Sequence, residues 1–165
     1  MTRAGPVLVL ATLLGLFGCD HGTKHLAKAH LEGRSALELI PGVFDLRYTE
    51  NTDTAFSLLG RVLEPDVRHV LLTVTASLAV LALAVFILRR FADLGTLQRL
   101  GAALVMGGAL GNLSERVLRG YVIDFLHLHS WPVFNVADVA ICLGAPLLLF
   151  VGHAAQPKAE HENTS

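Results

Sequence analysis

Two aspartates, Asp124 and Asp138, lie in apolar segments of the sequence, where a charged carboxylate is unfavourable. Asp138 lies inside the apolar run 133–151, and Asp124 ends the short run Tyr-Val-Ile-Asp that precedes it. Crossing a bilayer takes ~20 mostly apolar residues, and an Asp at the centre of such a helix costs about 2.5–3.5 kcal/mol. Because ionisable residues within a membrane segment usually have a function, the pair predicts an acid/base centre. The structural alternative is that Asp124 caps a turn and Asp138 hydrogen-bonds a neighbouring helix.

The composition is that of a membrane protein. Of the 165 residues, 53% are hydrophobic and 16% are charged, and the mean hydropathy is +0.55. The length predicts a single domain, 1–165. A net charge of −1 argues against a nucleic-acid partner, which would require a concentrated basic face. Cys19 and Cys142 lie inside apolar runs, so we expect neither a disulfide framework nor a zinc site of cysteines.

Four apolar stretches, at about 5–20, 70–88, 100–113 and 133–151, predict four transmembrane helices. Between the first two, the segment 33–66 contains two strand patterns, 36–40 and 43–49, which predict a small β-sheet on the outer membrane surface. The polar tail 156–165 is expected to be disordered. The fold class is therefore an all-α polytopic membrane protein with a small sheet added.

Charge in one short link predicts the orientation. Arg89, Arg90 and Arg99 lie between the second and third stretches, which makes this link cytoplasmic and places both termini on the same side. A count of basic residues over all loops gives the opposite answer, but long loops contribute weakly to this rule. The polar ends of the helices, and hence the active site, are then expected towards the outer leaflet.

Further polar residues sit at the ends of these stretches. Asp20 and Lys24 are four residues apart, as are Asn112 and Arg116, so each pair shares one helix face. Asp20 and Lys24 have the alternative of a surface ion pair, and Arg116 that of an anchor to lipid phosphate. Asn51 lies near an expected turn.

The sequence also allows other interpretations. Residues 1–19 resemble a lipoprotein signal peptide with Cys19 as acceptor, although three further spans argue against export. A metal site of Asp124, His127 and His129 is the main enzymatic rival, but no HExxH pair supports it and the histidines fit a surface better. A serine hydrolase lacks the GxSxG elbow. A lipid-binding or transporter-like helix bundle would also explain carboxylates in a membrane.

Five ordered motifs resemble the lipoprotein signal peptidase family, the membrane aspartic peptidases also called signal peptidase II. They are DHGTK at 20–24, ENTDTAF at 50–56, GGALGNLSER at 107–116, YVIDF at 121–125 and FNVADVAICLG at 134–144. The resemblance implies a monomeric enzyme of the bacterial inner membrane without metal or cofactor. Its partners would be membrane lipids and diacylglyceryl-modified prolipoproteins, whose signal peptide it removes on the N-terminal side of the modified cysteine. A divergent, non-catalytic or lipid-binding protein of the same fold is the alternative.

The resemblance also implies roles for particular residues. Asp124 and Asp138 fall on the family's catalytic pair. The supporting polar positions are Asp20, Lys24, Asn51, Asn112, Arg116 and Asn135. Two residues depart from the pattern: Asp53 replaces an expected Gly, and Glu115 replaces an expected Asp before the Arg. These departures bear on substrate or inhibitor preference.

Overall fold

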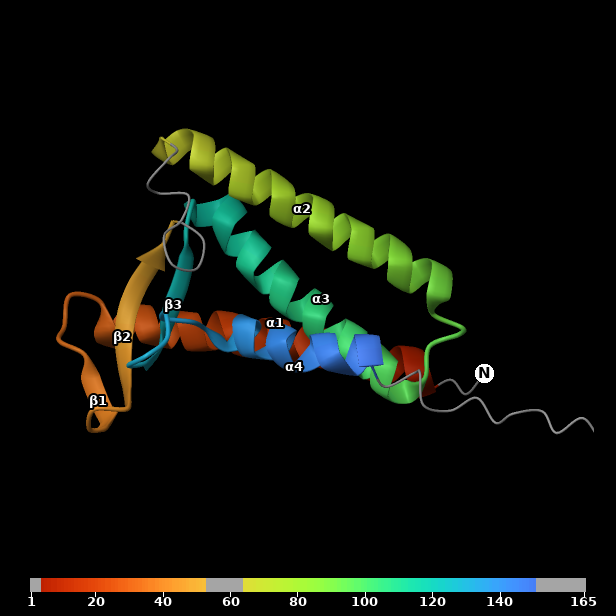
Figure 1. Cartoon of the computed structure of the whole chain (residues 1–165), viewed down its shortest axis with the longest axis horizontal. Helices are drawn as coiled ribbons and strands as arrows, with labels where there is room; N and C mark the ends of the chain where they lie inside the picture. The colour runs from red at the N-terminus through yellow and green to blue at the C-terminus, as the bar shows by residue number, and fades with distance from the viewer. Residues whose placement is uncertain (1–3, 53–63, 151–165) are drawn as a thin grey trace, which may run out of the picture.

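The computed structural model describes residues 4–52 and 64–150. Along the chain the elements are α1 (Ala4–Leu31), β1 (Leu37–Ile40), β2 (Phe44–Asn51), α2 (Pro65–Arg90), α3 (Thr96–Arg119), β3 (Val122–Leu128) and α4 (Val136–Phe150) (Figure 1). The four helices run side by side, and the sheet lies at one end of the bundle. The expected disordered tail, and residues 53–63 of the expected outer segment, fall outside the described residues.

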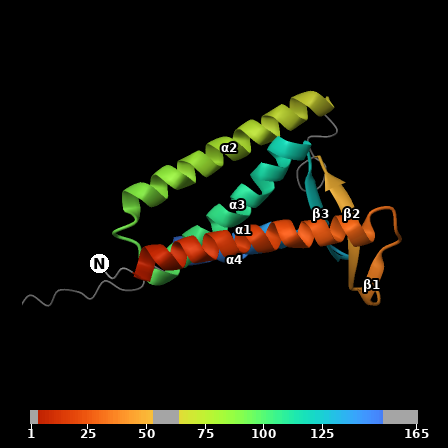
Figure 2. The ribbon, with the colours of Figure 1, turned by 180° about the vertical axis from the view of Figure 1, so that it is seen from behind.

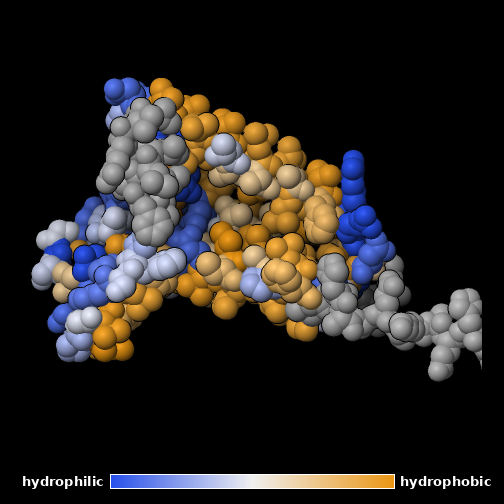
Figure 3. Space-filling model, viewed as in Figure 1, coloured by the Kyte–Doolittle hydropathy of each residue, from blue (hydrophilic) through white to orange (hydrophobic). Residues whose placement is uncertain are grey.

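The helical part of the molecule carries an apolar surface. Along its described length α2 has no buried residue, and leucines such as Leu78 and Leu88 are 60% and 80% exposed. Hydrophilic residues gather at the sheet end and at the link between α2 and α3 (Figure 3). An apolar belt between two polar ends is the surface expected of a membrane protein.

Length and apolar composition qualify two of the described helices as membrane spans, Gly5–Leu31 and Pro65–Arg90. The described part of α4 is apolar but shorter, with 15 residues. At 1.5 Å per residue it covers about 22 Å of the ~30 Å hydrocarbon core. Four spans are therefore not established by these criteria.

Three helices are longer than expected. α2 spans Pro65–Arg90 rather than 70–88. α1 continues past residue 20 to Leu31, and α3 extends from Thr96 to Arg119. The expected ends of α1 and α3 coincide with the first polar residues, but several of these, Asp20, Lys24 and Glu115, are buried against other elements, and the helices continue through them. α3 ends where Gly120 adopts a left-handed conformation (φ 81°) and its N–H donates to the carbonyl of Arg116, a cap that glycine forms at little steric cost.

Helix α3 is the centre of the bundle and contacts the other three helices. Seen from behind, α1 lies in front of α4, and the sheet stands at the C-terminal end of α1 (Figure 2). Glycine allows α3 and α4 to approach closely: a Cβ on Gly108 would lie 2.5 Å from the carbonyl oxygen of Ala137. Small residues serve this purpose in membrane helix pairs.

The described sheet is antiparallel in the order β1-β2-β3. β1 and β2 lie close to the two predicted strands, whereas β3 was not predicted. Its segment carries the apolar residues Val122, Ile123 and Phe125 on both sides of Asp124, so no clean alternation marks it as a strand. Ile123 and Phe125 pack with Ala27 of α1 in the core beneath the sheet.

A β-bulge in β2 changes which side chains share a face. Asp45 pairs with His127 and Leu46 with Leu126, but the next pair is Thr49 with Asp124, so two residues of β2 oppose one of β3. Asp45 and Asn51, which strict alternation would place together, therefore lie on opposite faces of the sheet. The bulge directs Asn51 towards the face of Asp124.

The Gly108→Ala substitution should destabilise the protein. The added Cβ meets backbone of α4 at 2.5 Å, and overpacking of this kind costs about 1–3 kcal/mol, more than the helix propensity gained from alanine. Thermal unfolding in detergent micelles measures the effect.

Gly15→Ala is the matched control, because no described atom lies within 4 Å of a Cβ built there. It should be as stable as the parent or slightly more so. Equal unfolding temperatures for both variants would contradict the close α3–α4 contact.

Candidate active site

Asp124 lies on β3 opposite Thr49 and is 2% exposed. Its Oδ2 accepts a hydrogen bond from Asn51 Nδ2 at 2.7 Å, and its Oδ1 accepts one from Asn135 Nδ2 at 2.6 Å. Burial raises the pKa of Asp124 to about 6; the two amides act in the opposite direction, and the charge of Asp138 adds to the increase. Asp124 can therefore exchange a proton much closer to neutral pH than an exposed aspartate.

Asp138 lies in the first turn of α4 and is less deeply buried than Asp124. Its Oδ2 accepts the backbone N–H of Asn135 at 3.1 Å, while Asn135 Oδ1 accepts the backbone N–H of Asp138 at 3.0 Å. This reciprocal pair satisfies N–H groups that a helix start leaves open. Asp138 thus has a structural role as a cap, and it stands at the positive end of the helix dipole.

Two asparagine amides join the carboxylates. Asn112 Nδ2 donates to Asp138 Oδ1 at 2.8 Å, and Asn135 Nδ2 donates both to Asp124 and, at 3.1 Å, to Asn112 Oδ1. Lys24 Nζ also donates to Asn112 Oδ1, at 2.9 Å. An ammonium group can only donate, so it fixes the oxygen of this amide towards itself and the NH₂ group towards Asp138.

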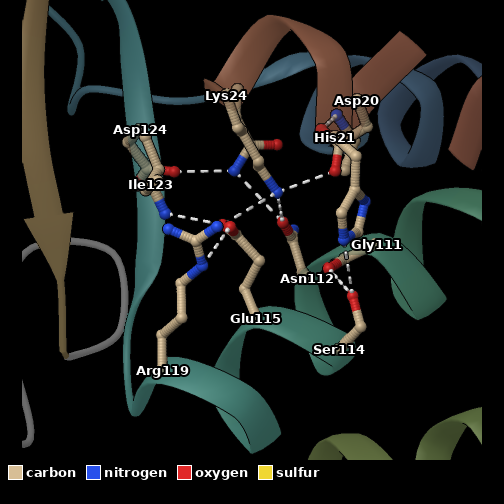
Figure 4. A network of polar contacts seen from close by, with 12 residues as sticks. Asp20, His21, Lys24, Gly111, Asn112, Ser114, Glu115, Arg119, Ile123 and Asp124 are labelled. Atoms are coloured by element: carbon tan, nitrogen blue, oxygen red, sulfur yellow. Dashed lines mark hydrogen bonds and ion pairs between the residues drawn. The ribbon is translucent and has the colours of Figure 1, made fainter. Parts of the chain in front are cut away.

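Lys24 is the cation at the centre of this network (Figure 4). It is 1% exposed, and its Nζ lies 2.8 Å from Asp20 Oδ2 and 3.5 Å from Glu115 Oε2. Glu115 Oε2 also accepts the backbone N–H of Ile123 at 2.9 Å, and Oε1 lies 3.4 Å from Arg119 Nε. The alternative of a surface ion pair for Asp20 and Lys24 is wrong, because both side chains are buried.

Asp20 connects α1 to the start of α4. Its Oδ1 accepts the backbone N–H of Ala137 at 3.0 Å, and it fits because Gly111 has no side chain: a Cβ there would lie 2.6 Å from Asp20 Oδ2. Cys19 precedes Asp20 within a helix that is continuous from Ala4 to Leu31. The lipoprotein alternative would require cleavage inside this helix, one residue before a buried part of the site.

Arg116 brings a positive charge to the two aspartates. Its side chain is half-buried on α3, and it interacts electrostatically with both Asp124 and Asp138.

The predicted site residues thus converge from five elements. α1 supplies Asp20 and Lys24, β2 supplies Asn51, α3 supplies Asn112 and Arg116, β3 supplies Asp124, and α4 with the residue before it supplies Asp138 and Asn135. The sequence drew attention to Glu115 only as a departure from a family pattern. Its contact with Lys24 was missed, although its place on α3, three residues after Asn112, could have suggested it.

The metal site of Asp124, His127 and His129 is not formed. Alternation along β3 turns the histidines away from Asp124, and both rings instead contact Asp45 of β2. The guanidinium of Arg47 holds the pKa of Asp45 well below its usual range, and His127 contributes in the same direction. Asp45 is therefore an anion on the opposite face of the sheet from the two candidate catalytic aspartates.

The fold resembles that of solved membrane enzymes. Two chains, titled bacterial membrane enzyme structures by the in meso method at 2.3 and 1.9 Å resolution, each give a TM-score of 0.72. They are 23% and 22% identical in sequence, cover 85% and 90% of this chain, and are themselves covered over 84% and 94% of their length. At this identity the likeness establishes the fold.

Sequence comparison identifies the family. A family model described as signal peptidase (SPase) II matches residues 12–153. Proteins named lipoprotein signal peptidase are 41% identical in Syntrophotalea carbinolica, over 87% of this chain and 88% of theirs, and 39% identical in Nitratidesulfovibrio vulgaris, over 95% and 94%. This chain belongs to the signal peptidase II family and is a membrane peptidase. A non-catalytic bundle of the same fold is not favoured by these matches.

Replacing Lys24 by Met should strongly destabilise the protein, because Asp20 and Glu115 would remain buried without their shared cation. Removing one partner of a buried ion pair costs about 3–5 kcal/mol. Unfolding by denaturant in detergent micelles measures the loss.

Lys28→Met is the control one turn along α1, where the pair with Glu32 is solvent-exposed, and it should change little. If Lys24→Met were as stable as Lys28→Met, the central role of Lys24 would be wrong.

Proposed function

We propose that this protein is an aspartic endopeptidase that removes the signal peptide from prolipoproteins, on the N-terminal side of the diacylglyceryl-modified cysteine. Family membership supports the substrate class, and the relatives are named for this activity. The observation that carries the aspartic mechanism is the connected pair of Asp124 and Asp138, each held by amide donors. Neutral amides orient the carboxylates without adding a charge.

In this mechanism the two aspartates have different tasks. Asp124 is the more deeply buried and keeps a proton more readily, so it acts as the acid. Asp138 has the better environment for a negative charge, since it lies at the start of α4 and accepts a backbone N–H, so it acts as the base. The pair shares one proton and titrates as a unit.

Asp138 removes a proton from water, whose oxygen forms a bond to the scissile carbonyl carbon, while the proton of Asp124 passes to the carbonyl oxygen. The product of this step is a neutral tetrahedral diol. The C–N bond then breaks: the proton on Asp138 moves to the leaving nitrogen, and a hydroxyl proton of the diol returns to Asp124. Protons and electron pairs balance over one turnover, and no covalent enzyme intermediate or metal takes part.

The supporting residues are assigned from their contacts. Asn51 and Asn135 hold Asp124, and Asn112 and Asn135 hold Asp138. Lys24 and Asp20 fix Asn112 and the start of α4. Arg116 provides positive charge beside both carboxylates, where it can stabilise the pair or bind an anionic group of the substrate.

We further propose four membrane crossings in the bacterial inner membrane, with both termini in the cytoplasm and the sheet on the outer surface. The polar end at the sheet supports this arrangement, as do Arg89 and Arg90 at the end of α2 and Arg99 in the first turn of α3. The site, which lies where the helices meet the sheet, would then open towards the outer leaflet. The diacylglyceryl group could stay in lipid while the scissile bond reaches the aspartates, so the lipid would help to position the substrate.

Asp124→Asn and Asp138→Asn should each lower turnover of a purified diacylglyceryl-modified prolipoprotein by at least 10²–10⁴-fold, roughly the contribution of general acid–base catalysis. The assay is run in EDTA, in which the parent should remain active. Asp93→Asn, at an exposed position of the α2–α3 link, is the matched control and should be as active as the parent.

Thermal unfolding of the same variants separates a catalytic role of Asp138 from its capping role. If Asp138 were purely structural, the Asp138→Asn variant would lose activity only in proportion to its loss of folded protein. A variant with activity within about tenfold of the parent would remove that aspartate from the catalytic pair. Loss of parental activity in EDTA would overturn the metal-free mechanism.

Cysteine labelling tests the orientation. In a background with Cys19 and Cys142 replaced by Ala, the exposed positions Ser35 and Asp93 are changed singly to Cys. A membrane-impermeant maleimide should label the Ser35→Cys variant in intact spheroplasts and the Asp93→Cys variant only after lysis. The reverse pattern would invert the proposed topology.

A further inference from the structure

The face of the sheet opposite Asp124 carries a second cluster, Asp45, His127 and His129, which the peptidase mechanism does not use. Asp45 Oδ2 lies 3.0 Å from His127 Nδ1 and 3.0 Å from His129 Nε2. All three ligand-type atoms lie within 4.8 Å of one another. We propose that this cluster binds a divalent transition-metal ion of the Zn²⁺ class.

The backbone holds these side chains in place. Asp45 is the register partner of His127 across β2 and β3, and the N–H of His129 donates to the carbonyl of Val43 at 3.1 Å. His127 lies on β3 and His129 directly follows the last residue of this strand, and both rings reach the same oxygen of Asp45. Little rearrangement of the backbone is needed to bring three ligands to one ion.

The spacing suits a small ion. Zn²⁺ bonds nitrogen and carboxylate oxygen at about 2.0–2.2 Å, so the edge of a tetrahedral site is about 3.3 Å. The two contacts of 3.0 Å are close to this edge, and no two of the three ligand atoms are more than 4.8 Å apart, so small side-chain movements would complete the site. Imidazole and carboxylate donors favour zinc, copper or nickel over Mg²⁺ and Ca²⁺, which prefer sets of oxygen ligands.

The three candidate ligands differ in their exposure to solvent. The Asp45 side chain is 2% exposed, whereas those of His127 and His129 are 14% and 38% exposed. An ion could therefore enter from the side of His129, and water would occupy the remaining coordination position. Three protein ligands and one open position form an accepted zinc arrangement.

Arg47 would compete with a metal ion for the carboxylate of Asp45. Its Nε donates to Asp45 Oδ1 and its Nη2 to Oδ2, each at 2.8 Å. Its side chain is 41% exposed, so Nη2 can leave Oδ2 to the ion while Nε keeps its bond to Oδ1. That remaining bond would orient the carboxylate as outer-shell hydrogen bonds do in metal sites.

The test uses the full-length protein purified with an affinity tag that contains no histidine, treated with EDTA and then freed of it. Zn²⁺ binding is measured in competition with a chromophoric chelator, and Co²⁺ is used as a spectroscopic probe of tetrahedral coordination. The parent should bind one Zn²⁺ per chain, and Zn²⁺ should raise its unfolding temperature.

His129→Ala should weaken binding by more than the roughly 10–100-fold that loss of an outer-shell partner costs. Asp45→Asn should do the same, but it also disturbs the contact with Arg47. His129→Ala is therefore the deciding variant, because its side chain is the most exposed of the three and its loss should leave the fold intact. His30→Ala, at an exposed histidine of α1, should bind like the parent. No Zn²⁺ binding by the parent, or equal binding by the parent and His129→Ala, would overturn the proposal.

Discussion

The arrangement of the site depends on the buried ammonium group of Lys24. It compensates the carboxylates of Asp20 and Glu115 and accepts no hydrogen bond, so it determines which way the Asn112 amide points. That amide in turn directs an N–H to Asp138, and its oxygen receives the Asn135 amide that also reaches Asp124. One buried charge thus sets the polarity of a hydrogen-bond chain between elements far apart in the sequence, and each member is costly to leave unpaired.

The sheet adds a geometric constraint to this electrostatic one. The bulge in β2 sends Asn51 to the face of Asp124 and leaves Asp45 on the other face, with His127 and His129. A three-stranded sheet thereby presents two distinct polar clusters, one on each of its faces. Glycines at 108 and 111 let α4 and Asp20 approach α3 closely enough for the helix ends to reach the first cluster.

The sequence predicted those parts of the structure that have a local signal. Apolar runs located the helices, and alternation located β1 and β2. Polar residues near the helix ends identified Asp20, Lys24 and Asn112 as candidates, and a carboxylate inside an apolar run identified Asp138. The predicted helix ends were misplaced because, in the sequence, the residues of a buried polar network resemble the start of a loop. β3 was missed because both of its faces are covered. The pairing of the histidines with Asp45 depends on strand register, which a single sequence does not specify.

The central claim is that Asp124 and Asp138 share one proton and that this proton resides on Asp124. Infrared spectroscopy tests this claim most directly. The C=O stretch of a protonated carboxyl group is followed as pH rises from about 4 to about 8, a range that spans ordinary and raised aspartate pKa values. A buried carboxyl band should disappear with a midpoint of about 6, because Asp124 is protonated below its raised pKa and ionised above it. The band should be absent in Asp124→Asn and present in Asp138→Asn. A band that persists in Asp124→Asn, or the absence of any band titrating in this range, would contradict the account.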